Sequence, residues 1–184
     1  MDFGLLELIN SLRGQSNLLE GLMQNLSNNL FGLFLAFFVV PYFFYKSQEK
    51  LLWVFIVWIL TIGITDFSAN LLKSYFLDFR PCFSDYSYLL DGEGQLLNQC
   101  SATLTGMPSN HSANFFAGSL FLLTIFKVNR YSLIFLLITC SVALSRIYLG
   151  KHFPHQVFAG ACYGAVLGCL AGYLYLKNFR NSLN

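Results

Sequence analysis

The chain has 184 residues, which is enough for one domain with a substantial core. Hydrophobic residues make up 55% of it, charged residues make up only 11%, and the mean hydropathy is +0.55. Because an average soluble domain carries about 25% charged residues, this composition excludes a soluble protein. The net charge of +2 is too small and too scattered to suggest nucleic-acid binding.

Residues 1–27 mix leucines with charged and amide side chains. This pattern predicts an interfacial helix, or a pair of helices, lying on the membrane, and a poorly ordered leader is the alternative. Asp2 and Glu7 stand where a signal peptide would carry basic residues, so we do not expect a cleaved signal peptide.

A membrane-spanning helix needs about 20 apolar residues, and five stretches meet or nearly meet this length. They are Leu30–Tyr45, Leu51–Leu72, Ser112–Phe126, Tyr131–Leu149 and His155–Leu176. We therefore expect a single all-α domain, residues 1–184. It should be an integral membrane bundle of five transmembrane helices plus the N-terminal interfacial helix.

Basic residues predict the orientation of these spans, because cytoplasmic loops are enriched in lysine and arginine. Pairs of them fall between spans one and two, between spans three and four, and after span five, at Lys46, Lys50, Lys127, Arg130, Lys177 and Arg180. The other connections, residues 73–111 and 145–154, then lie together outside the cytoplasm. We expect a bacterial cytoplasmic (inner) membrane protein with its site on the periplasmic side.

The predicted outer loop, residues 81–107, is long and polar. It contains Cys82 and Cys100, whereas the other three cysteines lie in apolar stretches. Two cysteines in one extracytoplasmic loop predict a disulfide that closes it, and two free thiols are the alternative.

Three cations are predicted on the outer side. Lys73 and Arg80 are seven residues apart, about two helical turns, so they should share one face while the helix lasts; Pro81 then ends or redirects it. Arg146 closes the fourth span on the same side. Ionisable residues at membrane depth are costly, and a cluster of cations favours a polyanion such as phosphate.

Two histidines are predicted beside these cations. Pro108, Ser109, Asn110 and His111 precede the third span, where a helix start offers free N–H groups to phosphate oxygens. His152 follows Arg146 by six residues. Two histidines at a phosphate pocket allow one to attack phosphorus and the other to protonate the leaving oxygen. A single histidine at a membrane edge is more often a helix cap or an interfacial residue, and a single lysine or arginine more often snorkels to the surface. The prediction rests on their joint occurrence on one side.

Three motifs in order resemble the signature of the type 2 phosphatidic acid phosphatase superfamily. They are Lys73-(six residues)-Arg80-Pro81, then Pro108-Ser109-Asn110-His111, then Ser145-Arg146-(five residues)-His152. That superfamily includes lipid phosphate phosphatases, undecaprenyl pyrophosphate phosphatases, glucose-6-phosphatases and vanadium haloperoxidases.

The resemblance implies a role for each motif residue. His152 would be the nucleophile that forms a phosphohistidine, and His111 the general acid. The phosphate would be bound by Lys73, Arg80, Ser109, the backbone N–H of Asn110, and Arg146. Members of the family need no metal or other cofactor, and vanadate mimics their transition state.

Two positions depart from the family pattern. Asn110 stands where glycine is usual, so its side chain should narrow the pocket. Gln156 stands where an aspartate is usual, four residues after the nucleophile; it can still accept a hydrogen bond from the ring of His152. The glucose-6-phosphatase branch also has glutamine there, which favours an active enzyme.

Two further features are expected to be structural. Asp66 is a supporting residue that pairs with a basic group or bonds to a neighbouring helix. Glycines recur at every fourth position in the last span, at Gly160, Gly164, Gly168 and Gly172. Such a stripe lets helices pack closely, within this bundle or, as the alternative, between subunits.

We expect a metal-independent phosphohydrolase acting on a membrane lipid phosphate or pyrophosphate. Undecaprenyl pyrophosphate, phosphatidate, phosphatidylglycerol phosphate and lipid A all fit. A soluble sugar-phosphate phosphatase, and a non-enzymatic phosphate or phospholipid binder or transporter, are the alternatives. The expected partners are the lipid substrate and the bilayer, and the oligomeric state is open.

Overall fold

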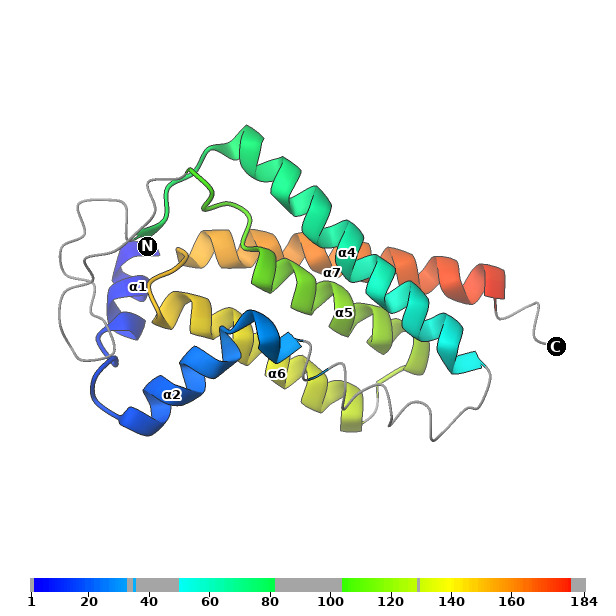
Figure 1. Cartoon of the computed structure of the whole chain (residues 1–184), viewed down its shortest axis with the longest axis horizontal. Coiled ribbons are helices and arrows are strands. Elements are labelled where there is room, and N and C mark those ends of the chain that lie inside the picture. The colour runs from blue at the N-terminus through cyan, green and yellow to red at the C-terminus, as the bar shows by residue number, and fades with distance from the viewer. Residues whose placement is uncertain (1, 33–34, 36–49, 82–103, 129, 180–184) are drawn as a thin grey trace.

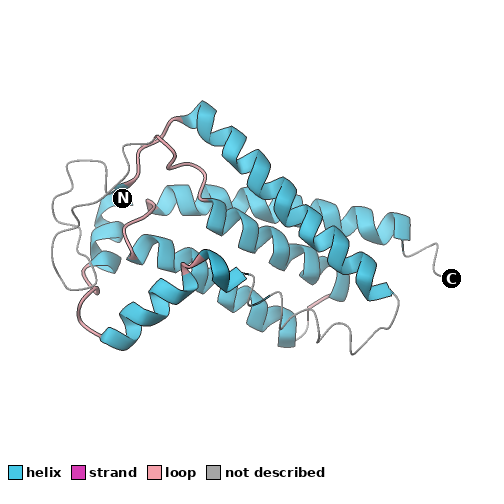
Figure 2. Ribbon diagram, in the orientation of Figure 1, coloured by secondary structure: helices cyan, strands magenta, loops and turns pink. Residues whose placement is uncertain are grey.

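The fold is all-α, as predicted. A computed structural model describes residues 2–32, 35, 50–81, 104–128 and 130–179, and within these ranges it contains helices and no strands (Figures 1 and 2). The helices are α1 (Asp2–Asn10), α2 (Asn17–Leu26), α4 (Lys50–Phe76), α5 (Asn110–Phe126), α6 (Arg130–Tyr148) and α7 (Pro154–Phe179).

The last four helices correspond to the predicted spans two to five. Within the described ranges, two stretches are long and apolar enough to cross a membrane, Leu52–Phe76 and Pro154–Phe179, and Ser132–Tyr148 is a shorter apolar helix. The outer surface of α4 carries exposed apolar side chains, including Ile64, Phe67 and Leu71, which suits contact with lipid. The first predicted span lies almost wholly outside the described residues, so the count of five remains a prediction.

Helices α5 and α7 form the centre of the bundle and run side by side (Figure 1). The glycine stripe of α7 is buried against α5. A Cβ atom at Gly164 or Gly168 would overlap the backbone carbonyl of Ala113 or Ala117. The prediction that this stripe packs inside the bundle is confirmed, because only glycine allows the two backbones to approach this closely.

Helix α4 crosses α5 and is fixed to it by both apolar and polar contacts. Trp58 Nε1 donates a hydrogen bond to the carbonyl of Gly118 (3.2 Å), and Trp58 packs in one cluster with Val54 and Phe121. On the other side of α5, the hydroxyls of Ser119 and Thr139 join α5 to α6. Buried hydroxyls and indole N–H groups need such partners at membrane depth.

The N-terminal residues form two helices, which is the second of the two arrangements expected there, and both pack against α6. Arg13 and Glu20 make a buried ion pair (2.7 Å) that joins the segment after α1 to α2. Asn10 Nδ2 donates to the carbonyl of Tyr148 (3.0 Å), at the end of α6. Leu18 and Leu22 are exposed on α2, which suits a helix at the membrane interface.

Candidate active site

A cavity of about 530 Å³ gathers nearly all of the predicted site. It lies between α4, α5, α6 and the segment that follows α2. Its lining includes both histidines, the three cations, and two further predicted residues: His111, His152, Lys73, Arg80, Arg146, Asn110 and Asp66. Motifs separated by up to 79 positions in the sequence therefore meet in one place.

His152 lies in the loop between α6 and α7, where the chain reverses. Helix α6 ends at Tyr148, and Gly150 at φ 65° allows the turn that returns the N–H groups of Lys151 and His152 to the carbonyl of Arg146 (3.0 and 3.2 Å). His152 is only 2% exposed. The turn therefore fixes the nucleophile candidate next to the arginine of its own motif.

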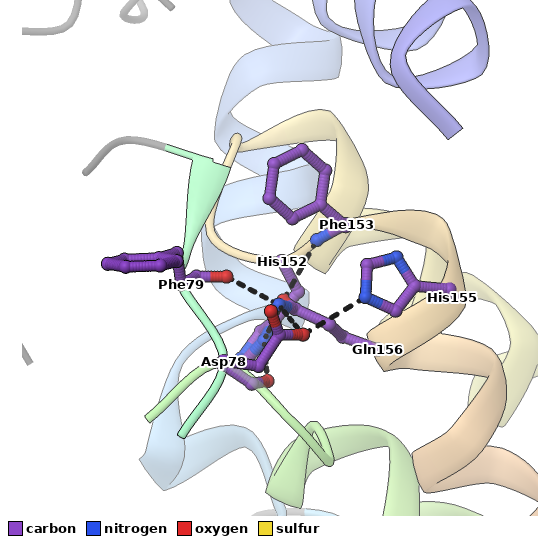
Figure 3. A network of polar contacts seen from close by, with 7 residues as sticks. Asp78, Phe79, His152, Phe153, His155 and Gln156 are labelled. Carbon is purple, nitrogen blue, oxygen red and sulfur yellow. Dashed lines mark hydrogen bonds and ion pairs between the residues drawn. The ribbon is translucent and has the colours of Figure 1, made fainter. Parts of the chain in front are cut away.

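The hydrogen bonds of His152 select one tautomer. Its Nδ1 lies 2.9 Å from the carbonyl oxygen of Gly106 and 3.2 Å from Oε1 of Gln156 (Figure 3). Both neighbours are acceptors, so Nδ1 carries the proton. The other ring nitrogen, Nε2, is left with a free lone pair, which is what a nucleophile requires.

The electrostatic surroundings of His152 keep its ring neutral. Burial holds the pKa of His152 well below its ordinary value, and the positive charges of Arg146, Arg80 and Lys73 lower it further. A protonated imidazole has no lone pair to attack with. The same cations that suit a phosphate therefore also keep this histidine in its reactive form.

Gln156 is buried at the centre of a network that also contains Asp78, a residue not singled out from the sequence (Figure 3). Its Oε1 accepts from the N–H of Phe153 (3.1 Å) as well as from His152. Its Nε2 donates to Oδ2 of Asp78 (2.8 Å) and to the carbonyl of Phe79 (2.5 Å). The expected bond between Gln156 and His152 is present, and a carboxylate lies one side chain beyond it.

Asp78 also contacts His155, whose Nε2 lies 3.0 Å from the same carboxylate oxygen. An aspartate at position 156, as in the common family pattern, would place a second carboxylate beside Asp78. The amide avoids that repulsion, which gives a physical reason for glutamine at this position. The only sequence signal for Asp78 was its place two residues before Arg80, inside the first motif.

The two arginines reach the cavity from different places. Arg146, at the end of α6, donates to the carbonyl (3.3 Å) and hydroxyl of Ser27, so the segment after α2 holds its guanidinium. Arg80 Nη2 contacts the carbonyl of Thr105 (3.5 Å). The Nε atoms of both arginines are buried with no hydrogen-bond partner among the described residues. Such donors suit an anion in the cavity.

The expectation that Lys73 and Arg80 share one helical face is wrong. Helix α4 ends at Phe76, Leu77 has φ 44°, and Arg80 belongs to the following loop. A residue before proline also disfavours the helical conformation, which keeps Arg80 in the loop. Both cations still line the cavity, one from the helix and one from the loop.

The start of α5 presents the second motif. Its first intrahelical bond runs from the N–H of Ala113 to the carbonyl of Ser109 (2.9 Å), so the N–H groups of the three residues between them precede the helical ladder. Ser109 is fully buried, and its hydroxyl has no partner among the described residues. His111 lines the cavity, within hydrogen-bonding reach of the Ser27 backbone.

The side chains of Asn110 and Asp66 join α5 to α4. Asn110 Nδ2 lies 2.9 Å from Oδ1 of Asp66 and 2.9 Å from Oδ1 of Asn70. Of the two roles expected for Asp66, the structure shows hydrogen bonding to a neighbouring helix. Cys82 and Cys100 lie outside the described residues, so their disulfide stays a prediction.

Residues 56–180 match the family model of the PAP2 superfamily. The chain belongs to the PAP2 superfamily. This confirms the family inferred from the three motifs, all of which lie within the matched range.

Two curated relatives are lipid A 4'-phosphatases. The chain is 27% identical over 168 residues to that of Porphyromonas gingivalis, covering 88% of this chain and 68% of the relative. It is 34% identical over 70 residues to that of Bacteroides thetaiotaomicron, covering 38% of this chain and 29% of the relative. With the family, these relatives confirm the prediction of a membrane lipid phosphatase; they leave its substrate undetermined.

The fold is similar to that of a transmembrane PAP2-type phosphatidylglycerolphosphate phosphatase from Bacillus subtilis. The TM-score is 0.67 with 22% sequence identity, over 96% of this chain and 87% of the other. This similarity supports the transmembrane fold.

Proposed function

We propose that this PAP2 protein removes phosphate from a membrane lipid phosphate or pyrophosphate through a phosphohistidine at His152. The observation that carries the proposal is the convergence of three cations and two histidines on one cavity beside the start of α5. Isolated charges at membrane depth are costly, and a bound phosphate would offset their mutual repulsion.

Phosphate binding is the first step of the proposed mechanism. Arg80 and Arg146 would each direct their unpaired Nε toward phosphate oxygens, and Lys73 would add a point charge. The hydroxyl of Ser109 and the free N–H groups at the start of α5, including that of Asn110, would donate to the remaining oxygens. These groups stabilise the charge on the equatorial oxygens as it redistributes during transfer.

Transfer to the histidine follows. Nε2 of His152 attacks phosphorus, the bond to the ester oxygen breaks, and His111, protonated beside the bound anionic phosphate, donates a proton to the departing oxygen. The ring of His152 becomes cationic as the nitrogen–phosphorus bond forms. Its Nδ1–H remains bonded to Gly106 and Gln156, which hold the ring in place.

Hydrolysis closes the cycle. His111, now unprotonated, accepts a proton from water, the water oxygen attacks phosphorus, and the bond to Nε2 breaks. Inorganic phosphate leaves and His152 returns to its neutral form, which its surroundings favour. The proposed cycle uses no metal ion or other cofactor.

The cavity walls favour a lipid substrate. Part of the lining is apolar and includes Ile59, Ile62, Trp58 and Phe115. The names of the curated relatives favour lipid A among the candidates, which also include phosphatidate, phosphatidylglycerol phosphate and undecaprenyl pyrophosphate. A soluble sugar phosphate would leave the apolar walls without a partner. We further propose that the site faces the periplasm from the inner membrane, as the basic residues indicate.

Phosphate release by the purified protein in detergent tests this proposal. We expect release from at least one of these lipids, unaffected by EDTA, inhibited by vanadate, and abolished by His152→Ala in protein that remains folded. Activity retained by His152→Ala would contradict the nucleophile assignment, and activity lost in EDTA but restored by a divalent ion would contradict the metal-free cycle. Phosphate binding without any release would indicate the binder or transporter instead.

A further inference from the structure

A second group of polar side chains lies in the same cavity, deeper than the cations. Along α4 the cavity is lined in turn by Lys73, Asp66 and Ile59, at intervals of seven residues. At about 1.5 Å per residue, each interval is about 10 Å along the helix axis. The cavity wall along α4 thus changes from cationic to hydrogen-bonding to apolar. A phosphorylated lipid changes in the same order, from its phosphate through its polar linker to its hydrocarbon chains.

The hydrogen bonds of this group fix the orientation of two amides. Nδ2 of Asn110 and Nδ2 of Asn114 both lie close to Oδ1 of Asp66, at 2.9 and 2.8 Å. A carboxylate in these bonds only accepts, so each asparagine must direct its NH₂ group to Asp66. Their carbonyl oxygens therefore cannot bond to the same carboxylate.

These two amide oxygens are left as acceptors without donors. Oδ1 of Asn110 and Oδ1 of Asn114 are buried and have no hydrogen-bond partner among the described residues, and both residues line the cavity. Buried polar atoms in folded proteins are nearly always paired, and exceptions call for an explanation. A ligand that supplies hydrogen-bond donors at this depth would provide one.

We propose that Asn110, Asn114 and Asp66 form a subsite for hydroxyl or amide N–H groups on the neutral part of the substrate, next to its phosphate ester. This subsite deepens the lipid phosphatase proposed above and rests on it. The carboxylate of Asp66 would repel a second phosphate placed here. The preferred substrate is therefore a lipid that has no second phosphate beside the reacting one and whose polar linker carries hydroxyls or amides, such as a phosphorylated aminosugar lipid.

The subsite discriminates between lipids that have the same phosphate and similar chains. Ceramide 1-phosphate carries a hydroxyl and an amide N–H near its phosphate, whereas phosphatidate carries only ester groups there. Phosphatidate would bury the two amide oxygens unpaired, and a site built for a donor rejects the analogue that lacks it. This pair of lipids therefore separates recognition of donors from recognition of phosphate.

The test compares kcat/KM for ceramide 1-phosphate and phosphatidate of matched chain length, in the same mixed micelles, with lipid A as a sugar-based donor substrate. We expect the wild-type protein to prefer the two donor-bearing lipids by about tenfold. The variant Asn114→Leu should lower this preference about fivefold or more, and Asn114→Thr, which keeps an acceptor oxygen, should retain more of it.

Asn70→Leu is the comparison variant. Asn70 donates to Oδ2 of Asp66 (3.1 Å) and accepts from Nδ2 of Asn110 (2.9 Å) but does not line the cavity, so its loss should lower the preference less than Asn114→Leu does. A wild-type ratio near one, or a preference unaffected by Asn114→Leu, would overturn the subsite while phosphate release still upheld the phosphatase. Release of phosphate from none of the lipids would overturn both the subsite and the phosphatase. If a variant fails to fold, the wild-type ratio of kcat/KM values still tests the subsite.

Discussion

Gln156 illustrates how one side chain can depart from a family pattern and still serve the same histidine. Its Oε1 accepts a hydrogen bond from the ring Nδ1–H of His152, and its NH₂ group donates to Asp78 and to the carbonyl of Phe79. The family usually has a carboxylate at this position; here the carboxylate belongs to Asp78, which is hydrogen-bonded to Gln156. We infer that Gln156 and Asp78 act as a pair in orienting His152.

This pairing predicts the effect of a nearly isosteric change. Gln156→Glu would replace the NH₂ group by an oxygen facing the acceptors of Asp78 and Phe79, so we expect kcat to fall by at least tenfold. Adding Asp78→Asn supplies a donor to the new carboxylate and should restore much of the loss. The measurement is a double-mutant cycle on kcat, with thermal unfolding in detergent recorded for each variant.

Asp78→Asn alone is the control for this cycle, because its side-chain oxygen can still accept from Gln156 and the effect should be small. Strictly additive losses in the double variant would contradict the pairing of these two residues. If all three variants lost the same thermal stability, Gln156 and Asp78 would only stabilise the loop and would not orient His152.

Residues of the three motifs could be found from the sequence because each motif has a fixed internal spacing. Lys73, Arg80, His111, Arg146 and His152 all line the cavity. Asp78, Asn114 and Ser27 could not be found in this way. Their importance comes from contacts across the bundle, at sequence separations of 78, 48 and 119 residues.

At the scale of elements, the pairing of α5 with α7 positions two of the three motifs. Ser109 at the start of α5 is joined to α7 by the bond from its N–H to the carbonyl of Gln156 (3.1 Å). Ser112 Oγ donates to the carbonyl of Val157 (2.8 Å). Close approach of the two helices therefore sets the distance between the phosphate-binding turn and the loop that carries His152.

A methyl group on the glycine stripe should disturb this pairing. Gly164→Ala would place a Cβ against the carbonyl of Ala113, so we expect the free energy of unfolding to fall by about 1–3 kcal/mol. The measurement is the unfolding temperature in detergent, which should be lower. Gly63→Ala is the matched control in α4, where a Cβ meets nothing within 4 Å. An unfolding temperature unchanged by Gly164→Ala would contradict the close packing of α5 on α7.

The elements themselves could largely be predicted, because apolar stretches of this length have few alternatives to helices in a membrane. Spans two to five agree with α4 to α7 to within a few residues. The end of α4 could not be predicted from hydrophobicity, since Phe76, Leu77 and Phe79 continue the apolar pattern beyond it. The left-handed backbone of Leu77 ends the helix instead, four residues before Pro81.

Over the whole molecule, the site lies where several chain segments meet at one end of the bundle. In Figure 1 the loop between α6 and α7 lies at the same end as α1, and the C-terminus lies at the other. The N-terminal helices contribute directly, because Ser27 after α2 holds Arg146. Composition and motif order could indicate a membrane phosphatase, but not that the N-terminal segment would support the third motif.

A phosphate bound to His152 during turnover can be trapped and located in the chain. The protein is mixed with a substrate labelled with ³²P, quenched in alkali within milliseconds to seconds, and digested to locate the label. We predict an acid-labile, alkali-stable phosphate on the peptide containing His152, absent in His152→Ala and formed more slowly in His111→Ala, which lacks the proton donor for the leaving oxygen. Label on another residue, or phosphate release with wild-type kinetics from His152→Ala, would contradict the account.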